Sequence, residues 1–190
     1  MKRIILFASG SGSNVENIYN YFKENKAINI DLVLTNKKDA LVLERCQRLG
    51  IACMYFNKIA FTEKEIVLCL LKSLNPDLIV LAGFLLKIPQ SIVHAFPDKI
   101  INIHPALLPK YGGKGMYGHR VHQAIKENNE KETGISIHFV NENYDEGSII
   151  KQVTIPVPSQ ATAEEIGAAV HQLEYQYFPV VIKELLDQDK

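Results

Sequence analysis

Short apolar runs alternate with segments of helical periodicity along most of this chain. This alternation is typical of β-α-β units arranged around a mostly parallel sheet. Several runs are continuous stretches of Val, Ile and Leu, which suit strands that are buried on both faces. Seven strands are expected, at residues 3–8, 29–35, 52–56, 78–81, 100–103, 133–140 and 148–155. We therefore predict an α/β fold with a Rossmann-like, mostly parallel, seven-stranded sheet.

The last two expected strands are separated only by the polar segment 141–147. A parallel connection needs a crossover of a dozen or more residues, and this segment is too short to supply one. The two strands should therefore pair antiparallel. The sheet is predicted to be mixed, with an antiparallel C-terminal edge.

Helices are expected between the strands. The periodicity favours helices at 14–24, at 40–49 with Gly50 as the C-terminal stop, at 62–73, and over the helix-like segment 118–127. The chain contains no internal repeat, low-complexity tract or linker-like segment. We therefore expect a single domain over residues 1–190.

Two pairs of residues have the spacing of a capping box, in which a Thr and a Glu three residues later satisfy each other's backbone donors. Thr62 with Glu65 is expected to open one helix. Thr162 with Glu165 is expected to open a long C-terminal helical segment. Pro179 lacks a backbone donor, so it should kink or break that segment, and two helical pieces are expected.

Composition limits the kind of partner. Lys and Arg total 21 and Asp and Glu total 21, for a formal net charge of +0, so no basic field is available to attract a nucleic acid. No run approaches the roughly 18 apolar residues of a membrane span. Three cysteines without a C-x-x-C spacing predict neither a disulfide framework nor a zinc site, and we expect each to be a small buried residue. A cytoplasmic protein with no membrane or nucleic-acid partner is expected.

A glycine-containing loop, Ser-Gly-Ser-Gly-Ser-Asn at residues 9–14, lies between the first strand and the first helix. Its glycines allow a tight turn, and the helix N-terminus favours an anion. A dinucleotide site would need glycine in place of Val15 and an acid in place of Asn36, and a P-loop would need a lysine. A single phosphate monoester fits best. The alternative is an ordinary turn capped by Ser13 or Asn14.

Asn102 and His104 lie two residues apart at the end of an expected strand, so they should share one face at the edge where open α/β sheets bind ligands. Asp145 lies in an acidic loop after a later strand. If Asp145 is near His104, its charge should raise the pKa of the imidazole and make it a proton donor near neutral pH. The alternatives are a structural histidine, a loop-capping asparagine and a solvent-facing acid.

Two further features stay open. His119 and His122 have an i, i+3 spacing, but without a neighbouring carboxylate or cysteine motif we expect no metal. The stretch 110–118 has four glycines in nine residues and should be mobile. It is either a substrate-covering loop or a slack connector.

Together these segments resemble the folate-dependent glycinamide ribonucleotide formyltransferases over nearly the whole chain. The resemblance rests on the order and spacing of Gly12-Ser13-Asn14, Leu81-Ala82-Gly83-Phe84, Asn102-Ile103-His104-Pro105, Leu107-Leu108-Pro109, the stretch 134–140, Asp145 and Gly147. It implies the formyltransferase-type fold. It also implies transfer of a formyl group from 10-formyltetrahydrofolate to the glycyl amine of 5'-phosphoribosylglycinamide in purine biosynthesis.

The resemblance assigns roles to individual residues. Asn102, His104 and Asp145 match the family's catalytic residues, and Gly12, Ser13, Asn14 and Glu174 match its substrate-binding residues. The folate-binding positions are Lys64, Leu85, Leu86, Lys87, Ile88, Asn102, Val140, Asn141 and Asp145. Lys64 stands where relatives often have an arginine, and the 110–118 loop is longer and richer in glycine than in many members. No metal is implied, and the expected state is a monomer or a weak homodimer.

The chemistry agrees with these residue types. Formyl transfer passes through a tetrahedral species with a developing oxyanion, which Asn102 and protonated His104 are able to stabilise. An acceptor amine with a pKa near ~8 is partly free at neutral pH, so no serine or cysteine nucleophile is needed. Asp145 is suited to orient a water or the imidazole for proton transfer.

Three alternatives remain. A 10-formyltetrahydrofolate hydrolase would carry an extra N-terminal domain, and a methionyl-tRNA formyltransferase a basic C-terminal domain; we expect neither in this chain. From another class, a non-catalytic sugar-phosphate-binding module would keep only the glycine loop.

Overall fold

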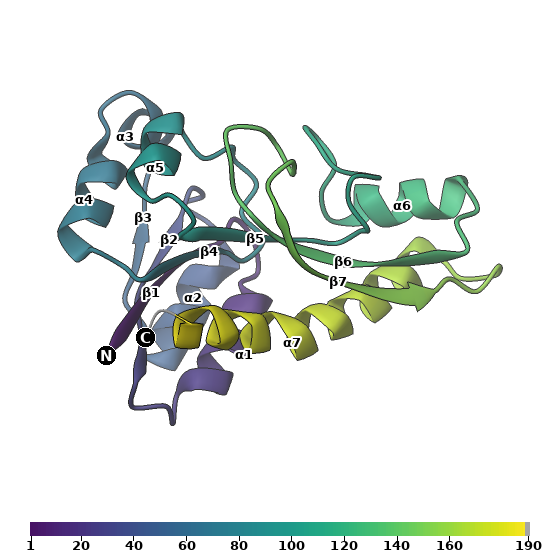
Figure 1. Ribbon diagram of the computed structural model, residues 1–190, viewed down its shortest axis with the longest axis horizontal. Coiled ribbons are helices and arrows are strands. Elements are labelled where there is room, and N and C mark those ends of the chain that lie inside the picture. The colour runs from purple at the N-terminus through teal and green to yellow at the C-terminus, as the bar shows by residue number, and fades with distance from the viewer. Residues whose placement is uncertain (189–190) are drawn as a thin grey trace. The chain divides into compact units, whose positions relative to one another are not determined.

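The computed structural model of the protein describes residues 1–188 (Figure 1). Residues 189–190, which belong to the predicted single domain, lie outside the described residues. Seven strands of the described chain form one sheet in the order β3-β2-β1-β4-β5-β6-β7. The predicted α/β fold with a mixed sheet is confirmed, because the pairs near the N-terminus are parallel and β6 and β7 are antiparallel.

The chain divides into two compact units, Met1–Ile101 with the residues from Glu184 onward, and Asn102–Lys183. The first unit contains β1 (Lys2–Phe7), α1 (Ser13–Phe22), β2 (Ile28–Thr35), α2 (Leu41–Leu49), β3 (Cys53–Tyr55), α3 (Lys58–Thr62), α4 (Ile66–Leu74), β4 (Leu78–Leu81) and α5 (Gln90–Ala95). Strand β5 (Ile100–His104) runs from the first unit into the second. The second unit continues with α6 (His119–Glu127), β6 (Glu132–Phe139), β7 (Ile149–Pro156) and most of α7 (Ala163–Gln188).

In the first unit, β1 is paired on both sides. It pairs parallel with β2 through Leu6 and Val33, and parallel with β4 through Leu6 and Val80. Leu6, Val33 and Val80 are fully buried, as expected for strands covered on both faces. The chain therefore moves outward from β1 to β2 and β3 and then returns to the other side of β1. The carboxyl ends of β1 and β4 form the kind of switch point at which α/β sheets bind ligands.

Four phenylalanines form an aromatic cluster in the first unit. The ring centroids of Phe7 and Phe84 are 5.1 Å apart, and those of Phe56 and Phe61 are 4.9 Å apart, which are favourable separations for aromatic pairs. Phe61 is buried and lies in the short helix α3. Asn57 caps this helix, because its side chain accepts a hydrogen bond from the Ala60 amide.

The predicted start of the helix over 62–73 is wrong, because Thr62 belongs to the preceding helix α3. Thr62 is the last residue of α3, and its hydroxyl donates to the Lys58 carbonyl instead of capping a new helix. Glu65 precedes α4 in a left-handed conformation with a φ of 51°. The capping box expected for Thr62 and Glu65 therefore does not form.

The second capping box is confirmed. The Glu165 amide donates to the Thr162 hydroxyl, and the Thr162 amide donates to the Glu165 carboxylate. Helix α7 then continues through Pro179 without interruption, so the predicted division into two pieces is wrong. A proline inside a helix costs about 3 kcal/mol. Burial of Phe178, Val181 and Ile182 around it offsets that cost, because each large apolar side chain contributes about 1.5–3 kcal/mol.

The cysteines only partly match their prediction. Cys46 is buried, whereas Cys53 is partly exposed and Cys69 is exposed. Cys69 lies on the solvent face of α4, which buries Val67, Leu68 and Leu71 instead. None of the helices within residues 1–188 has the length and apolar composition that crossing a bilayer requires.

Candidate functional site

The glycine loop follows β1 in the first unit. Gly12 precedes α1 with a φ of 72°, a left-handed conformation that glycine adopts without strain. A Cβ at this position would overlap the side chain of Val42, so the loop has no room for a larger residue. Ser13 begins the helix, and Asn14 is buried in its first turn. The backbone geometry is thus that of a tight turn into a helix N-terminus, which favours an anion.

Ser9 ties together the ends of three strands of the first unit. Its hydroxyl donates to Asn36, which follows β2, and accepts from the Leu85 amide beyond β4. Its own amide donates to the Gly83 carbonyl. Ser9 is buried, and as part of the glycine loop it carries no sequence signal of its own for this role. These bonds bring the glycine loop next to the segment that begins at Leu85.

The predicted folate-binding positions of the first unit lie in two places. Leu85, Leu86, Lys87 and Ile88 follow β4; Ile88 is buried and Leu85 is 37% exposed. Lys64 is exposed in the turn between α3 and α4. The first group is held beside the glycine loop through Ser9, whereas Lys64 is free to reach a ligand in solvent.

The three predicted catalytic residues meet in the second unit. Asn102 and His104 are at the end of β5, and Asp145 is in the loop between β6 and β7. The Asp145 carboxylate has one oxygen 3.6 Å from His104 Nδ1 and the other 3.5 Å from Asn102 Nδ2. Asp145 therefore lies near His104, as its predicted role requires.

His138 is a fourth member of this cluster and is not among the predicted site residues. Its Nε2 lies 3.1 Å from Asn102 Nδ2 and 3.7 Å from Asp145 Oδ1. The other ring nitrogen, Nδ1, donates to the Phe139 carbonyl, so Nε2 is left to accept from the asparagine amide. The sequence does contain a signal: Ser136 and His138 alternate along β6 and face the same side.

Each ring nitrogen of His104 faces an oxygen that accepts hydrogen bonds. Nε2 donates to the Tyr111 carbonyl oxygen at 2.7 Å, and Nδ1 faces Asp145. Burial lowers the pKa of His104 below its ordinary value, and it outweighs the Asp145 charge and the Tyr111 carbonyl, which both raise it. The predicted rise in pKa is therefore wrong, because the residue is only 3% exposed. The imidazole is neutral near pH 7 and is able to accept a proton on Nδ1.

Asp145 is fixed by its loop and its neighbours. Burial raises its pKa, but the His138 ring, the His104 charge and the Gly113 amide together lower it, so the carboxylate is ionised. Asp145 has a φ of 56°, which is uncommon for a residue with a side chain. Gly147 closes the loop where a Cβ would overlap the Phe139 carbonyl oxygen. Val140 and Asn141 begin the same loop, and the Asn141 side chain accepts from the Asn143 amide.

Glu174, the predicted substrate-binding acid, is buried on α7. His171 Nδ1 lies 3.0 Å from its carboxylate, and this hydrogen bond raises the pKa of His171. Burial lowers the pKa values of His104 and His122, and the Glu174 charge partly opposes this, so the acid belongs to the electrostatic surroundings of the cluster around His104.

His119 and His122 lie on α6, where His122 is buried and His119 is exposed. Within residues 1–188, no group of three or more His, Cys, Asp or Glu side chains is arranged to hold a metal ion. A cavity of about 400 Å³ lies beside the end of β7 and the first turn of α7, lined by Thr133, Ile155 and Ile166 among others. None of the predicted site residues lines that cavity.

The fold and the cluster define an α/β protein with an amide, a carboxylate and two imidazoles gathered at strand ends, a set suited to acid–base chemistry and oxyanion stabilisation. The sequence profile described as formyl transferase matches residues 2–182. The chain belongs to this family, which confirms the resemblance found in the sequence.

Curated relatives match nearly the whole chain. "Phosphoribosylglycinamide formyltransferase, chloroplastic" of Arabidopsis thaliana is 38% identical over 98% of this chain and 66% of the relative. The chain spans 62% of the length of the relative of the same name from Vigna unguiculata. "Phosphoribosylglycinamide formyltransferase" of Bacillus subtilis is 36% identical over 98% of this chain and 95% of the relative. The chain thus spans less than two thirds of the plant relatives and nearly all of the bacterial one.

A solved structure supports the same relationship. The crystal structure of phosphoribosylglycinamide formyltransferase from Bacillus halodurans has a TM-score of 0.89 and 30% identity, covering 100% of this chain and 97% of that one.

Proposed function

We propose that this protein transfers a formyl group from 10-formyltetrahydrofolate to the glycyl amine of 5'-phosphoribosylglycinamide, giving formylglycinamide ribonucleotide and tetrahydrofolate. The observation that carries the proposal is the position of the Asp145 carboxylate between His104 Nδ1 at 3.6 Å and His138 Nε2 at 3.7 Å, with Asn102 Nδ2 at 3.5 Å. Relatives that bear this activity in their names, at 35–38% identity, support the choice of substrates.

Asn102 is the proposed oxyanion donor. One N–H of its amide is directed to His138 Nε2, and the other makes only a long 3.5 Å contact with Asp145. The second N–H is therefore available to the formyl oxygen when a negative charge develops there. One positioned donor of this kind contributes about 10²–10³-fold to the rate.

His104 and Asp145 are the proposed proton-transfer groups. The neutral imidazole accepts a proton on Nδ1 from the attacking amine, and the carboxylate beside it stabilises the imidazolium that forms. The same proton is then delivered to the folate nitrogen as the bond to the formyl carbon breaks. Such acid–base assistance is worth about 10²–10⁴-fold.

We assign the acceptor's phosphate to Gly12, Ser13 and Asn14, since a tight glycine turn into a ten-residue helix favours an anion. Glu174 is the proposed partner of the ribose hydroxyl groups, because a buried carboxylate is a strong acceptor.

The folate is assigned to the strand-end segments. In the first unit, the proposed binding segment for the ring system is Leu85 to Ile88, which is mainly apolar and partly exposed. In the second unit, Val140 and Asn141 are the proposed folate-binding residues. Asn102 and Asp145 contribute polar groups at the reacting end. Lys64 is the proposed partner of the folate's glutamate carboxylates, as an exposed ammonium group suits a flexible anionic tail.

We infer that residues 1–190 act as one formyltransferase domain, since a single family profile spans residues from both units. A cytoplasmic location, a monomeric or weakly dimeric state, and the absence of metal, membrane and nucleic-acid partners remain predictions.

The proposal is tested by following the absorbance change when a 10-formylfolate analogue is deformylated, with and without the ribonucleotide. Turnover that requires the ribonucleotide supports the transferase. Turnover without it would indicate a 10-formyltetrahydrofolate hydrolase. Ribonucleotide binding without any turnover would indicate a non-catalytic sugar-phosphate-binding module.

A further inference from the structure

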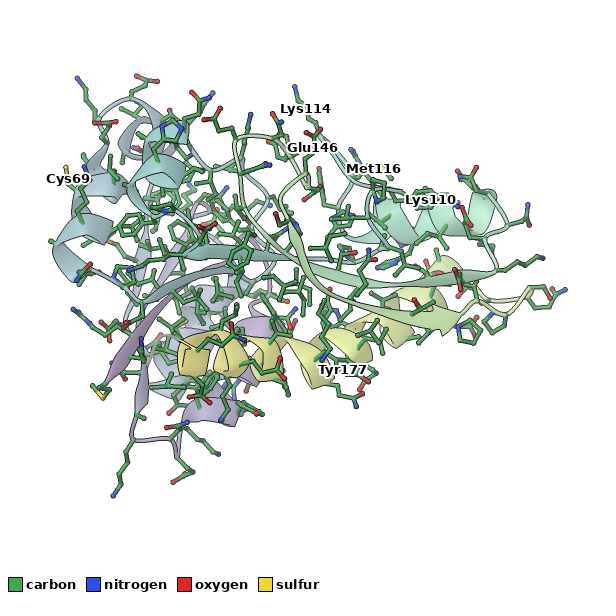
Figure 2. All side chains as sticks on the ribbon, in the orientation of Figure 1. Cys69, Lys110, Lys114, Met116, Glu146 and Tyr177 are labelled. Carbon is green, nitrogen blue, oxygen red and sulfur yellow. The ribbon has the colours of Figure 1, made fainter. Side chains whose placement is uncertain are left out.

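The glycine-rich loop at residues 110–118 bonds directly to both proton-transfer residues through its backbone. The Tyr111 carbonyl accepts from His104 Nε2 at 2.7 Å, and the Gly113 amide donates to Asp145 Oδ2 at 2.9 Å. Lys110, Lys114 and Met116, labelled in Figure 2, mark the course of this loop. The relative orientation of the imidazole and the carboxylate therefore depends on the backbone conformation over three consecutive residues.

That conformation is not one the loop would adopt by default. Tyr111 has a φ of 56°, and a residue with a side chain pays roughly 1–2 kcal/mol to enter the left-handed region. Gly113 and Gly115 have φ values of 95° and 91°, so the loop that follows is built from flexible residues. A contact outside the loop is needed to hold Tyr111 in place.

Glu130 supplies this contact. It lies between α6 and β6, and its amide donates to the Ile125 carbonyl at the end of α6. The Tyr111 hydroxyl donates to Glu130 Oε1 at 2.9 Å, and Lys110 Nζ lies 3.0 Å from the same oxygen. These two hydrogen bonds lower the pKa of Glu130, so the carboxylate is ionised near neutral pH.

The surroundings leave room for the tyrosine to move if this contact is lost. Tyr111 and Glu130 both line a cavity of about 270 Å³, together with Leu108, Ile125 and Thr133. The Tyr111 side chain borders this cavity and is held at its hydroxyl end by Glu130, with Asn128 as a second polar neighbour.

We propose that Glu130 is a positioning residue for formyl transfer: by accepting from the Tyr111 hydroxyl, it holds the carbonyl that orients His104 and the amide that orients Asp145. This inference rests on the proposed function for its kinetic consequence. Glu130 is proposed to act through Tyr111 and not by direct contact with a substrate.

The charge balance at His104 provides a readout that does not need turnover. Burial and His138 lower its pKa, whereas Asp145, the Tyr111 carbonyl and Glu174 raise it. Release of the loop removes the hydrogen bond to the Tyr111 carbonyl, which raises the pKa of His104. The titration midpoint of His104 should then move further down.

The test uses Tyr111→Phe and Glu130→Ala in the full chain, with kcat, both KM values, and the NMR titration of the His104 imidazole as measurements. We expect kcat to fall by between about 10-fold and 100-fold, because misplacement of reacting groups by an ångström is worth that much. Both KM values should change by less than about threefold, and the His104 midpoint should fall. Glu130→Gln keeps an acceptor oxygen without the charge, so it should recover most of the loss.

Controls separate this role from a structural one. Tyr117→Phe changes another tyrosine of the same segment, and Glu132→Ala removes a neighbouring carboxylate that lines the same cavity. Both should behave as wild type. The double variant Tyr111→Phe with Glu130→Ala should be about as slow as the slower single variant, because the two side chains share the bond that holds the loop.

The inference is overturned if Tyr111→Phe and Glu130→Ala match the two controls in kcat and in the His104 midpoint, or if Glu130→Gln is as slow as Glu130→Ala. Thermal melting checks that each variant is folded; an unfolded Glu130→Ala leaves Tyr111→Phe to decide. A wild-type protein without formyl transfer would contradict the proposed function instead. The His104 titration would still judge the positioning role in that case.

Discussion

Asp145 Oδ2 lies 3.6 Å from His104 Nδ1, although 41 positions separate the two residues in the sequence. The contact joins the end of β5 to the loop between β6 and β7. It places an ionised carboxylate next to a neutral imidazole nitrogen. The pair is therefore able to take up one proton and share the resulting charge, which is what a transfer from an amine to a folate nitrogen requires.

Removal of the carboxylate should affect turnover more than binding. Asp145→Asn and His104→Ala are each expected to lower kcat at least about 100-fold while the KM values change by a small factor. Glu146→Gln neutralises an exposed acid of the same loop and should leave kcat unchanged. Steady-state kinetics of the three variants check this. Near wild-type turnover in Asp145→Asn would remove its assigned role.

Burial should have the largest effect on the pKa of His104, and the Asp145 charge the second largest. The titration midpoint of His104 is expected below the ordinary histidine value, and Asp145→Asn should lower it further by removing the charge that raises the pKa. The depressed pKa of His104 also determines how the free energy of unfolding changes with pH. Between the depressed folded pKa and the ordinary unfolded one, the unfolded chain binds more protons, so stability rises with pH. NMR titration of the six histidines checks this, and a midpoint above the ordinary value would contradict it.

Changes in the glycine turn at Gly12 should weaken binding of the ribonucleotide and not of the folate. Gly12→Ala places a methyl group against Val42 at a φ of 72°, so the turn has to shift. We expect the KM for the ribonucleotide to rise at least about tenfold, since one lost charge-assisted bond is worth about 1.5–3 kcal/mol. Gly10→Ala, whose added methyl meets nothing within 4 Å, should raise it less. A loss confined to folate affinity would show that the phosphate lies elsewhere.

The two Thr/Glu pairs give a matched test of helix capping. Thr162→Ala removes a cap of α7 and should lower the free energy of unfolding by about 1 kcal/mol. Thr62→Ala removes a hydroxyl that bonds only within the last turn of α3, so its effect should be a few tenths of that. Urea denaturation measures both. Equal losses would mean that Thr162 does not act as a cap.

Much of the fold was predictable because strands leave a local signal. The expected strand at 78–81 coincides with β4, and most others agree within one or two residues. The errors came where tertiary packing outweighed a local rule. Thr62 and Glu65 have the spacing of a cap, but burial of Phe61 makes Thr62 the end of an earlier helix. Pro179 has the chemistry of a helix breaker, but buried neighbours on both sides keep α7 continuous.

The site was predictable in its side chains and not in its backbone. Asn102, His104 and Asp145 were found from their spacing and family resemblance. His138 was not, since its alternation with Ser136 along β6 is equally typical of a structural histidine in a buried strand. The Tyr111 carbonyl and the Gly113 amide hold His104 and Asp145, but backbone groups of this kind carry no residue-type signal. The pKa of His104 was predicted with the wrong sign because its burial could not be read from the sequence.

The most direct test follows the formyl carbon itself. The protein is mixed with formyl-labelled 10-formyltetrahydrofolate and 5'-phosphoribosylglycinamide, and the label is located by mass spectrometry. Wild type should place the label on the ribonucleotide amine, and Asp145→Asn should do so at no more than about 1% of that rate. Label that is released as free formate, or that reaches the ribonucleotide equally fast in Asp145→Asn, would contradict formyl transfer at this cluster.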